Sequence, residues 1–255
     1  MKVSIITVCL NSVSTIEDSI NSVMSQTYPD IEYIVVDGAS SDGTLDVIHR
    51  YRHHIHHFVT EPDRGIYDAM NKGIGLASGD VIGILNSDDV YEDEFVIQKV
   101  VEKFIESRSD IVLGDVVWVD RDDLRKIRRY YSSKYFQPWK LRIGWMPPHP
   151  ATFIKSATYK HAGLYSLDYR IAADYEMFVR MFLVHGFSFA RIPAILVRMR
   201  MGGISTSGFK SFWILNSEVV KACRQNKVYT NILLILTKFP FKIFQLLKKP
   251  KKLDH

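Results

Sequence analysis

Asn86, Ser87, Asp88 and Asp89 directly follow the apolar run Val81–Leu85. Residues two apart in an extended segment point to the same side, so the side-chain oxygens of Asn86 and Asp88 can face one cation. Oxygen ligands of this kind suit Mg²⁺ or Mn²⁺, which often share the phosphates of a substrate. The same residue types are common in turns, so an Asx turn that only ends the strand is the alternative.

Polar residues also follow two other apolar runs, at Asn11-Ser12 and from Asp37 to Gly43. Ligands of an open parallel sheet bind beyond the carboxyl ends of its strands. The chain has no GxGxxG after its first apolar run and no phosphate-binding P-loop. A bound diphosphate would therefore need another source of positive charge, and a metal ion is the simplest.

The elements that must position these residues alternate along the first third of the chain. Apolar runs of strand length are separated by segments with helical periodicity, which predicts an α/β fold with a mostly parallel sheet flanked by helices. The predicted strands are Val3–Val8, Glu32–Asp37, Phe58–Thr60 and Val81–Leu85, and the helices between them include Thr44–Tyr51 and Ile66–Ala77. Later we expect helices at 92–106, 174–185 and 209–225, strands at 111–113, 116–119 and 191–198, and a charged loop at 121–129.

Composition excludes several classes of protein. Hydrophobic residues make up 47% and charged residues 24%, values that are ordinary for a globular chain and exclude disorder and fibrous repeats. The two cysteines, Cys9 and Cys223, cannot form a disulfide framework or a CxxC zinc site. The first apolar stretch is too short and too polar for a secretory signal, so we expect a cytoplasmic protein.

The positive charge lies at the end of the chain. Residues 238–255 hold six lysines and one aspartate, a net charge of +5, which equals the net charge of all 255 residues. These lysines alternate with apolar residues and follow Ile232–Leu236, a pattern typical of an interfacial helix on an anionic membrane. The alternative is a terminal helix packed on the domain. The charge distribution favours a membrane surface over nucleic acid.

Several ordered stretches together resemble the inverting family 2 glycosyltransferases of the GT-A fold. The similarity is to small bacterial enzymes of exopolysaccharide, O-antigen and colanic-acid assembly. The matching stretches are Val3–Val8, Ser22–Tyr28, Val36–Thr44, Asp63–Gly73, Ala77–Asp80 and Leu85–Asp89, with weaker similarity to about Ser205.

The resemblance implies a nucleoside diphosphate sugar as donor. The positions that would contact this donor are Thr7, Val8, Asp37, Arg64, Asp68, Asn71, Lys72 and Ser87. Asp37 could instead cap the following helix, although Asp42 is better placed to do so. Asp68 and Lys72 could instead form an exposed i,i+4 ion pair.

The sequence departs from the family pattern at three positions. The metal motif of the family usually begins with Asp, and Asn86 stands there, so Asp88 should be the main ligand of Mn²⁺ or Mg²⁺. Met70 replaces an arginine that often precedes the residue matching Asn71. Ala173 replaces the first acid of the pair in which the family places its general base.

That resemblance assigns Asp174 as the general base that takes the proton of the acceptor hydroxyl. Asp174 also precedes a periodic apolar run and could cap the helix there, and both roles are compatible. Glu176 is the competing candidate for the base.

His149, in the segment Trp145–Pro150, and Ser205, in a Gly-rich loop, are expected acceptor or diphosphate contacts by resemblance. A structural histidine and a plain turn are the alternatives. The histidines at 49, 53, 54, 56 and 57 are expected to lie on a solvated helix end rather than to bind a metal.

Together these observations predict a GT-A domain over residues 1–207 and a basic, helical membrane-association segment over 208–255. The expected function is metal-dependent, inverting transfer of a hexose, from a UDP-linked donor, to a saccharide acceptor on polyprenyl diphosphate at the inner face of the cell membrane. The alternatives are a weakened nucleotide-sugar-binding protein, suggested by the three departures, and a nucleotidyltransferase, whose Gly-rich, Lys-containing first loop is absent.

Overall fold

The computed structural model describes residues 1–202 and 208–237 of the chain. The expected diphosphate contact Ser205 and the lysine-rich stretch 238–255 lie outside the described residues. Within the described part of the chain, no helix has both the length and the apolar character that crossing a membrane requires.

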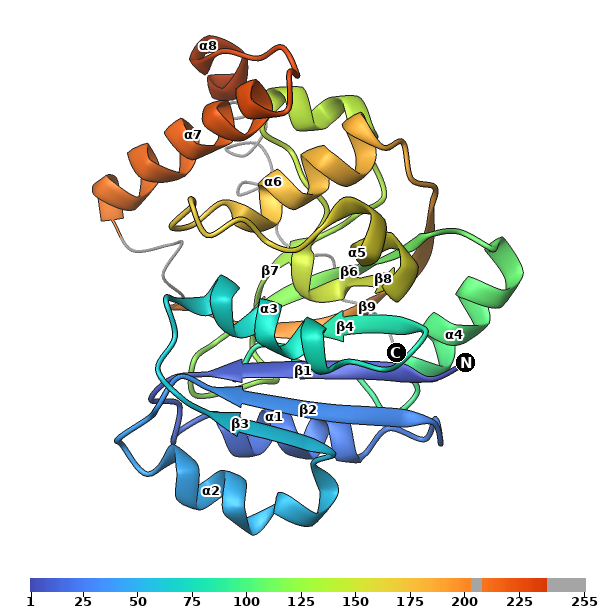
Figure 1. The fold of residues 1–255 in the computed structure, drawn as a ribbon, viewed down its shortest axis with the longest axis vertical. Coiled ribbons are helices and arrows are strands. Elements are labelled where there is room, and N and C mark those ends of the chain that lie inside the picture. The colour runs from blue at the N-terminus through green and yellow to red at the C-terminus, as the bar shows by residue number, and fades with distance from the viewer. Residues whose placement is uncertain (203–207, 238–255) are drawn as a thin grey trace.

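Strands and helices alternate through the first ninety residues, as the sequence predicts (Figure 1). Short apolar, β-branched runs form the strands, and segments with an apolar face every three or four residues form the helices. The elements are β1 (Val3–Cys9), α1 (Ile16–Met24), β2 (Ile31–Asp37), α2 (Thr44–Arg50), β3 (His57–Thr60), α3 (Ile66–Leu76), β4 (Val81–Ile84) and β5 (Asp89–Tyr91).

The second part of the fold is less regular. Its elements are α4 (Val96–Ser107), β6 (Ile111–Val119), β7 (Ile127–Tyr131), β8 (Thr152–Lys155), α5 (Ser156–Ala162), α6 (Ala173–Val179), β9 (Phe189–Arg200), α7 (Gly208–Gln225) and α8 (Ile232–Leu236). The two short strands expected at 111–113 and 116–119 form one continuous strand, β6. The segment expected to be a charged loop enters β7 at Ile127, because this part of the chain pairs antiparallel with β6.

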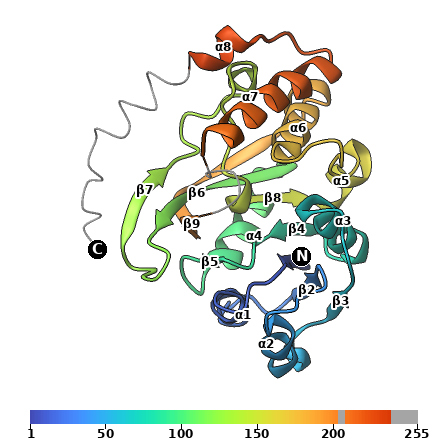
Figure 2. The same ribbon diagram turned by 90° about the vertical axis from the view of Figure 1, so that its left-hand side faces the viewer.

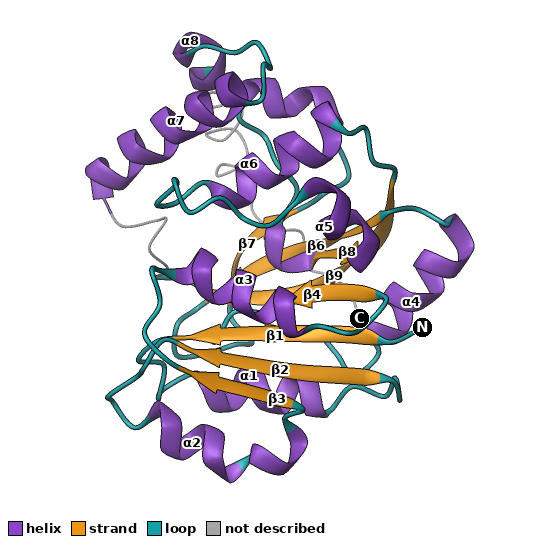
Figure 3. Cartoon of the chain, in the orientation of Figure 1, coloured by secondary structure: helices purple, strands orange, loops and turns teal. Residues whose placement is uncertain are grey.

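One sheet runs through the molecule in the order β3-β2-β1-β4-β8-β6-β9-β5, and β7 pairs with β6 at its side (Figure 3). Six of the nine strands in the described residues, namely β1, β2, β3, β4, β6 and β9, run in the same direction. The carboxyl ends of β1 to β4 lie together at the left of Figure 1. This edge is where the polar turns of the sequence meet.

The two faces of the sheet carry separate apolar cores. Alternate residues of each strand point to opposite faces, so Ile6 and Val8 of β1 join the core under α3 and α6, whereas Val3 and Ile5 join the core against α1 and α4. Both cores are closed to solvent. The prediction of a sheet covered by helices on both faces is confirmed.

The C-terminal helices pack onto the same body as α6 (Figure 2). Val219, Ala222 and Cys223 of α7 and Ile235 of α8 are buried in the core that also contains α6. Residues 208–237 therefore share a hydrophobic core with the segment proposed as the catalytic domain. The division into two segments at residue 207 stays a prediction from charge and composition.

Candidate active site

The carboxyl ends of β1, β2 and β4 form the floor of the candidate site. Thr7 and Val8 lie in β1, and both side chains are buried. The Thr7 hydroxyl accepts a hydrogen bond from the Tyr33 hydroxyl at 3.1 Å inside the core. The predicted donor contact at these two positions could therefore involve only the main chain.

Asp37 ends β2 and is fully buried, with its carboxylate surrounded by donors. It accepts the Ser40 N–H at 2.9 Å, the Ser40 hydroxyl at 2.5 Å and the Thr60 hydroxyl at 2.7 Å, and the Cys9 thiol lies 3.5 Å away. The carboxylate thereby joins the loop after β2 to the end of β3. A nucleoside could reach it only if one of these donors gave way. The N-cap of α2 is Gly43, and Asp42, the residue before it, accepts the N–H of Thr44, the first residue of the helix, at 3.0 Å.

Asp63 lies against Gly38, the residue after Asp37. A Cβ atom on Gly38 would be 2.5 Å from Asp63 Oδ2, so only glycine lets the carboxylate approach this closely. Asp63 Oδ1 accepts the Gly65 N–H at 2.8 Å. The exposed side chain of Leu10 also lies near this glycine, with its Cδ1 3.4 Å from the same Cβ position. Gly38 is thus flanked by one carboxylate and one apolar side chain.

The first turn of α3 carries a chain of ion pairs. Asp68 accepts the Arg64 N–H at 3.1 Å, and this bond, with the charges of Lys72 and Arg64, lowers the pKa of Asp68. Lys72 Nζ lies 2.8 Å from Glu61 Oε1 and 3.8 Å from Asp68 Oδ2, which raises the pKa of Lys72. Arg64 is exposed and 3.6 Å from Asp68. The i,i+4 pair considered from sequence is present, and Arg64 and Lys72 keep their charges at the surface.

Asn71, on the next turn of α3, has both ends of its amide engaged. Its Oδ1 accepts the Tyr165 N–H at 2.9 Å, and its Nδ2 donates to the Tyr165 carbonyl at 2.8 Å. This pair of bonds fastens α3 to the loop that leads into α6. In this structure Asn71 positions that loop, and its side chain has little hydrogen-bonding capacity left for a nucleotide-sugar donor.

Asn86 to Asp89, the metal motif after β4, are held in place by hydrogen bonds to each other and to Ser12 and Arg200. Asn86 Nδ2 donates to Asp89 Oδ2 at 3.1 Å, and the Ser87 hydroxyl is 2.9 Å from that of Ser12. The Arg200 guanidinium, at the end of β9, donates to the Asp88 carbonyl at 3.0 Å. Ser87 thus ties β4 to β1, and Arg200 brings a positive charge beside Asp88.

Three observations make this segment fit a hard cation. Burial raises the pKa of Asp88, although the charge of Arg200 opposes the shift. Burial and the charge of Asp88 raise the pKa of Asp89 well above its ordinary value. Asn86 Oδ1 is buried and has no hydrogen-bond partner within the described residues. Two desolvated carboxylates and an orphaned amide oxygen are what a divalent ion would stabilise.

The protein alone does not enclose such an ion. Among residues 1–202 and 208–237, no three His, Cys, Asp or Glu side chains gather closely enough to bind a metal. A cation held by Asp88 and Asn86 would therefore complete its coordination with water or a ligand, as Mg²⁺ commonly does.

Two members of the histidine-rich segment take structural roles, since His56 Nδ1 accepts the Tyr33 N–H at 3.0 Å and His49 packs edge-on against Phe58.

Asp174 lies in the first turn of α6, across from the start of α3. Its Oδ1 accepts the Tyr175 N–H at 2.8 Å and lies 3.4 Å from the Tyr67 hydroxyl of α3. Burial raises the pKa of Asp174 to about 6, and these two hydrogen bonds oppose the shift. A carboxylate with this pKa is ionised near neutral pH and still basic enough to accept a proton.

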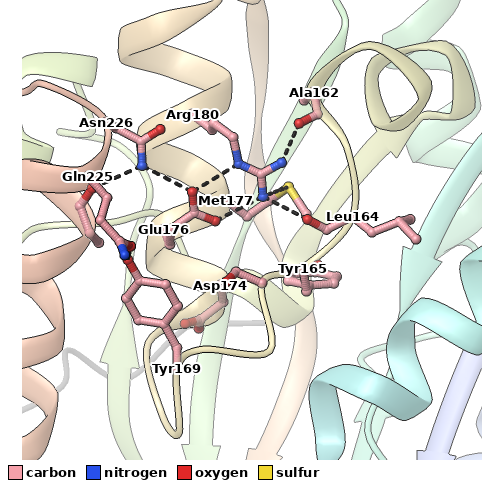
Figure 4. Close-up of polar contacts among 12 residues, drawn as sticks. Ala162, Leu164, Tyr165, Tyr169, Asp174, Glu176, Met177, Arg180, Gln225 and Asn226 are labelled. Carbon is pink, nitrogen blue, oxygen red and sulfur yellow. Dashed lines mark hydrogen bonds and ion pairs between the residues drawn. The ribbon is translucent and has the colours of Figure 1, made fainter.

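Glu176, the competing base, is occupied by an ion pair on the same helix (Figure 4). The Arg180 guanidinium donates to both of its carboxylate oxygens at 2.9 Å, and Asn226 Nδ2 donates at 3.0 Å. The pair is mostly buried and ties α6 to the end of α7. Glu176 therefore has a structural role, and Asp174 is the carboxylate of α6 that is left for chemistry.

His149 contributes to an aromatic wall beside Asp174. Its Nε2 is 2.7 Å from the Tyr165 hydroxyl, and the Tyr165 ring stacks on Tyr67 at 5.7 Å between centroids. Burial lowers the pKa of His149 to about 4, so the imidazole is neutral. A neutral ring can offer a hydrogen bond to an acceptor sugar but supplies no charge to a diphosphate.

Sequence reasoning overlooked four residues that shape this site: Tyr67, Asp63, Arg200 and Glu218. Tyr67 and Asp63 lie inside a stretch quoted for the family resemblance, and Arg200 precedes the quoted Gly-rich loop, so their positions carried a signal. Glu218 carried none. It lies in a helix 44 residues beyond Asp174, and its carboxylate reaches the main chain just before that residue.

Comparisons with known proteins identify the family of this chain. The family described as Glycosyl transferase family 2 matches residues 4–162, more than half of the chain. An uncharacterised glycosyltransferase of Mycobacterium tuberculosis is 33% identical over 184 residues, which are 71% of this chain and 69% of the relative. A PGL/p-HBAD biosynthesis glycosyltransferase of Mycobacterium bovis is 31% identical over 185 residues, 70% of this chain and 69% of the relative.

Solved structures agree on the fold. TarS of Staphylococcus aureus, in complex with UDP-GlcNAc, superposes with a TM-score of 0.70 over 87% of this chain, at 18% identity. The mannosyltransferase PcManGT of Pyrobaculum calidifontis, in complex with GDP-Man and Mn²⁺, gives 0.64 over 88%, also at 18% identity. This chain spans 66% and 63% of those two chains. The GT-A fold expected from sequence is confirmed, and the chain belongs to glycosyl transferase family 2.

Proposed function

We propose that this glycosyltransferase moves one hexose from a UDP-linked donor to a lipid-linked saccharide acceptor, with inversion at the anomeric carbon. The observation that supports the proposal is a pair of carboxylates in unlike surroundings. Asp88 follows β4 beside the charge of Arg200, and Asp174 faces the start of α3 within an aromatic wall. The two suit, respectively, a metal-bound diphosphate and an incoming alcohol.

On the donor side, the anionic character of the site supports a cation. Asp63, Asp68 and Asp88 lie beyond the ends of β3 and β4, and a diphosphate entering among them would be repelled. A divalent ion held by Asp88 and Asn86 would neutralise the departing nucleotide. Arg64, Lys72 and Arg200 supply the remaining positive charge. The Mn²⁺-bound mannosyltransferase with the same fold is consistent with such an ion.

On the acceptor side, Asp174 would take the hydroxyl proton as the acceptor oxygen attacks the anomeric carbon. The bond from that carbon to the diphosphate oxygen breaks on the opposite face, so configuration inverts. The raised pKa of Asp174 favours this step because the carboxylate then binds the transferred proton more strongly. Tyr67, whose own pKa is raised well above its ordinary value, stays protonated and orients the carboxylate.

Two departures from the family pattern do not weaken this site. Met70 and Ala173 are buried in the core between α3 and α6, and neither is exposed by more than 3%. Side chains at these positions pack the helices and do not line the site. Asn86 is the one departure at the site itself, and its consequence would be weaker metal binding.

A decisive test is nucleotide release from a panel of UDP, GDP and dTDP sugars, with and without Mn²⁺, for the wild type and Asp88→Ala. We expect release from one UDP sugar that needs the metal, and loss of metal-dependent donor binding in the variant. Donor binding without turnover of any panel member would make the chain a nucleotide-sugar-binding protein. Turnover that is unaffected by EDTA and by Asp88→Ala would remove the metal from the mechanism.

The proposed lipid-linked acceptor fits a surface on α7 and α8. A groove of about 490 Å³ is lined by Trp213, Ser217, Val220, Lys221, Arg224, Gln225 and Ile232. Tyr229 and Leu233 beside it are 72% and 73% exposed. Exposed aromatic and apolar side chains flanked by cations are typical of an interface with an anionic membrane, and six lysines follow in the sequence.

Binding to vesicles that contain phosphatidylglycerol tests this partner. The chain should be cut after Thr237, because Ile235 is buried in the core and a shorter chain would lose packing. We expect the cut chain to lose vesicle binding and Leu233→Ser to weaken it. Undiminished sedimentation of the cut chain with these vesicles would contradict the role of the lysine-rich end.

A further inference from the structure

The loop between α5 and α6 delivers Asp174, and its last residues are held by one side chain of α7. Glu218 Oε1 accepts the Arg170 N–H at 2.8 Å, and Glu218 Oε2 accepts those of Ile171 and Ala172, both at 2.9 Å. These N–H groups lie at the start of a helix, where no carbonyl of the helix itself can satisfy them. A carboxylate there satisfies all three and interacts favourably with the helix dipole.

Two other residues of α7 fasten the same loop. Lys221 Nζ donates to the Asp168 carbonyl at 2.9 Å and lies 4.6 Å from the centre of the Tyr169 ring. The Tyr169 hydroxyl donates to Gln225. Residues 218, 221 and 225 lie on one face of α7, three and four positions apart. This face therefore holds the whole segment from Asp168 to Ala172.

Ile171 is held from both sides. Its N–H is bound by Glu218, and its carbonyl accepts the Tyr67 hydroxyl of α3. Tyr67 is also the side chain that approaches Asp174. The main chain three residues before Asp174 is thus clamped between α3, which carries the proposed donor contacts, and α7.

The charges around Asp174 are few. Glu218 of α7 is the charged side chain whose field acts on Asp174. The Glu176–Arg180 pair begins on the same helix, and its members offset each other. Tyr67 of α3 and Tyr165 of the preceding loop also interact with Asp174, and both hydroxyls remain protonated because their pKa values are raised well above the ordinary value. The negative charge of Glu218 raises the pKa of Asp174, in addition to the larger effect of burial.

We propose that Glu218 is a positioning residue for Asp174: by gathering three successive N–H groups, it fixes the start of α6 and places the base opposite α3. This inference rests on the proposed role of Asp174 as general base. It assigns a part in the reaction to α7, a helix outside the family match at residues 4–162.

The test compares Glu218→Gln with Glu32→Gln in the full-length chain. Glu32 is a matched control because it also accepts a main-chain N–H, that of Ser78 at 2.8 Å, within a buried network, but at the opposite edge of the sheet. We expect Glu218→Gln to lower kcat about tenfold or more, with the KM for the donor little changed. The acid limb of its pH–rate profile should move to lower pH, because a negative charge near Asp174 has been removed. Glu32→Gln should lower the Tm without moving the profile.

A readout that needs no turnover separates this inference from the proposed function. The Asp174 carboxyl can be titrated by carbon NMR after selective labelling of aspartate, with Asp174→Asn to assign the signal. The midpoint should fall in Glu218→Gln, and Glu218→Asp, which keeps the charge, should restore it in part. If the wild type transfers no sugar but the midpoint still falls, the glycosyl transfer fails and the positioning role stands. An unchanged midpoint with an unchanged profile, or equal losses in both variants, would overturn the inference.

Discussion

Asp37 is a buried aspartate at the end of β2, Asp174 is a half-buried aspartate in the first turn of α6, and their surroundings are opposite. Asp37 accepts three hydrogen bonds of 2.5–2.9 Å from Ser40 and Thr60. Asp174 accepts one short bond, from its own helix, and lies 3.4 Å from the Tyr67 hydroxyl, which donates to the Ile171 carbonyl. One carboxylate is saturated by donors, whereas the other is desolvated without being satisfied.

The difference separates a carboxylate that holds a loop in place from one that can take part in a reaction. A carboxylate saturated by donors is fixed in place, so it can anchor the loop that forms the donor side. A carboxylate that is desolvated and poorly solvated by the protein has a raised pKa and can accept a proton during a reaction. Hence the two halves of the site differ less in residue type than in the number of donors that each aspartate receives.

The largest expected effect is the loss of catalysis in Asp174→Asn. The amide keeps the shape of the side chain and can still accept the Tyr175 N–H, but it cannot take a proton. We expect kcat to fall by about 10²- to 10⁴-fold, the usual contribution of a general base. The affinity for the UDP sugar, measured by calorimetry with Mn²⁺, should be unchanged.

Glu176→Gln is the control for that variant. It lies two residues further on α6 and loses part of the ion pair with Arg180. It should lower the Tm and leave kcat within a few fold, because Glu176 is turned into the packing between α6 and α7. A wild-type rate in Asp174→Asn, or a collapse of the rate in Glu176→Gln, would reassign the base.

Removal of the Asp37 carboxylate, which is saturated by donors, should instead be measured as a change in stability. Asp37→Ala leaves the buried Ser40 N–H and the Thr60 hydroxyl without their acceptor, and we expect a loss of about 2 to 4 kcal/mol in the free energy of unfolding. Urea unfolding measures this loss, and Asp37→Asn should recover part of it. If Asp37→Ala keeps wild-type stability and loses only donor binding, Asp37 would be a free ligand and its contrast with Asp174 would disappear.

Much of the fold could be predicted from the sequence, because β1 to β4 are apolar runs separated by amphipathic helices. The parallel pairing of these strands follows from that alternation. The antiparallel strands β5, β7 and β8 could not be predicted: they are three to five residues long and their pairing depends on partners distant in sequence. β7 was hidden further, since Arg128 and Arg129 are typical of a solvated turn.

The site was predictable where function lies in consecutive residues. Asn86 to Asp88 and the start of α3 are of this kind. The sequence could not show that Asn71 is bound at both ends to Tyr165, or that Glu218 reaches the main chain before Asp174. Both depend on contacts between segments 47 to 94 residues apart, and a single sequence contains no pattern that fixes such distances.

The unsatisfied environment of Asp174 should also cost stability. Its pKa is raised from 3.8 to about 6, so the folded state binds the proton more strongly than the unfolded chain does. The charged form therefore destabilises the fold above about pH 6, and this cost vanishes as the pH falls toward the unfolded pKa. Asp174→Asn should be more stable than the wild type by about 1 to 3 kcal/mol at pH 8, with the difference shrinking toward pH 4. Equal stability at both pH values would mean that Asp174 is better solvated than its contacts indicate.

The smallest expected effect concerns the glycine next to the saturated aspartate. In Gly38→Ala the new Cβ would meet Asp63 Oδ2 at 2.5 Å, and because Asp63 is held by the Gly65 N–H, its carboxylate must move. We expect donor affinity to weaken by about three- to tenfold, with little change in kcat, since the displaced group lies on the donor side.

Gly75→Ala, in α3, is the matched control because no atom of a neighbouring segment lies within 4 Å of its added methyl group. It should bind the donor like the wild type and be equally or more stable, because alanine favours a helix over glycine. Unchanged affinity in Gly38→Ala would show that Asp63 can move without consequence. The donor side would then be fixed by Asp37 alone, and the contrast between a rigid binding half and a reactive half would rest on that one carboxylate.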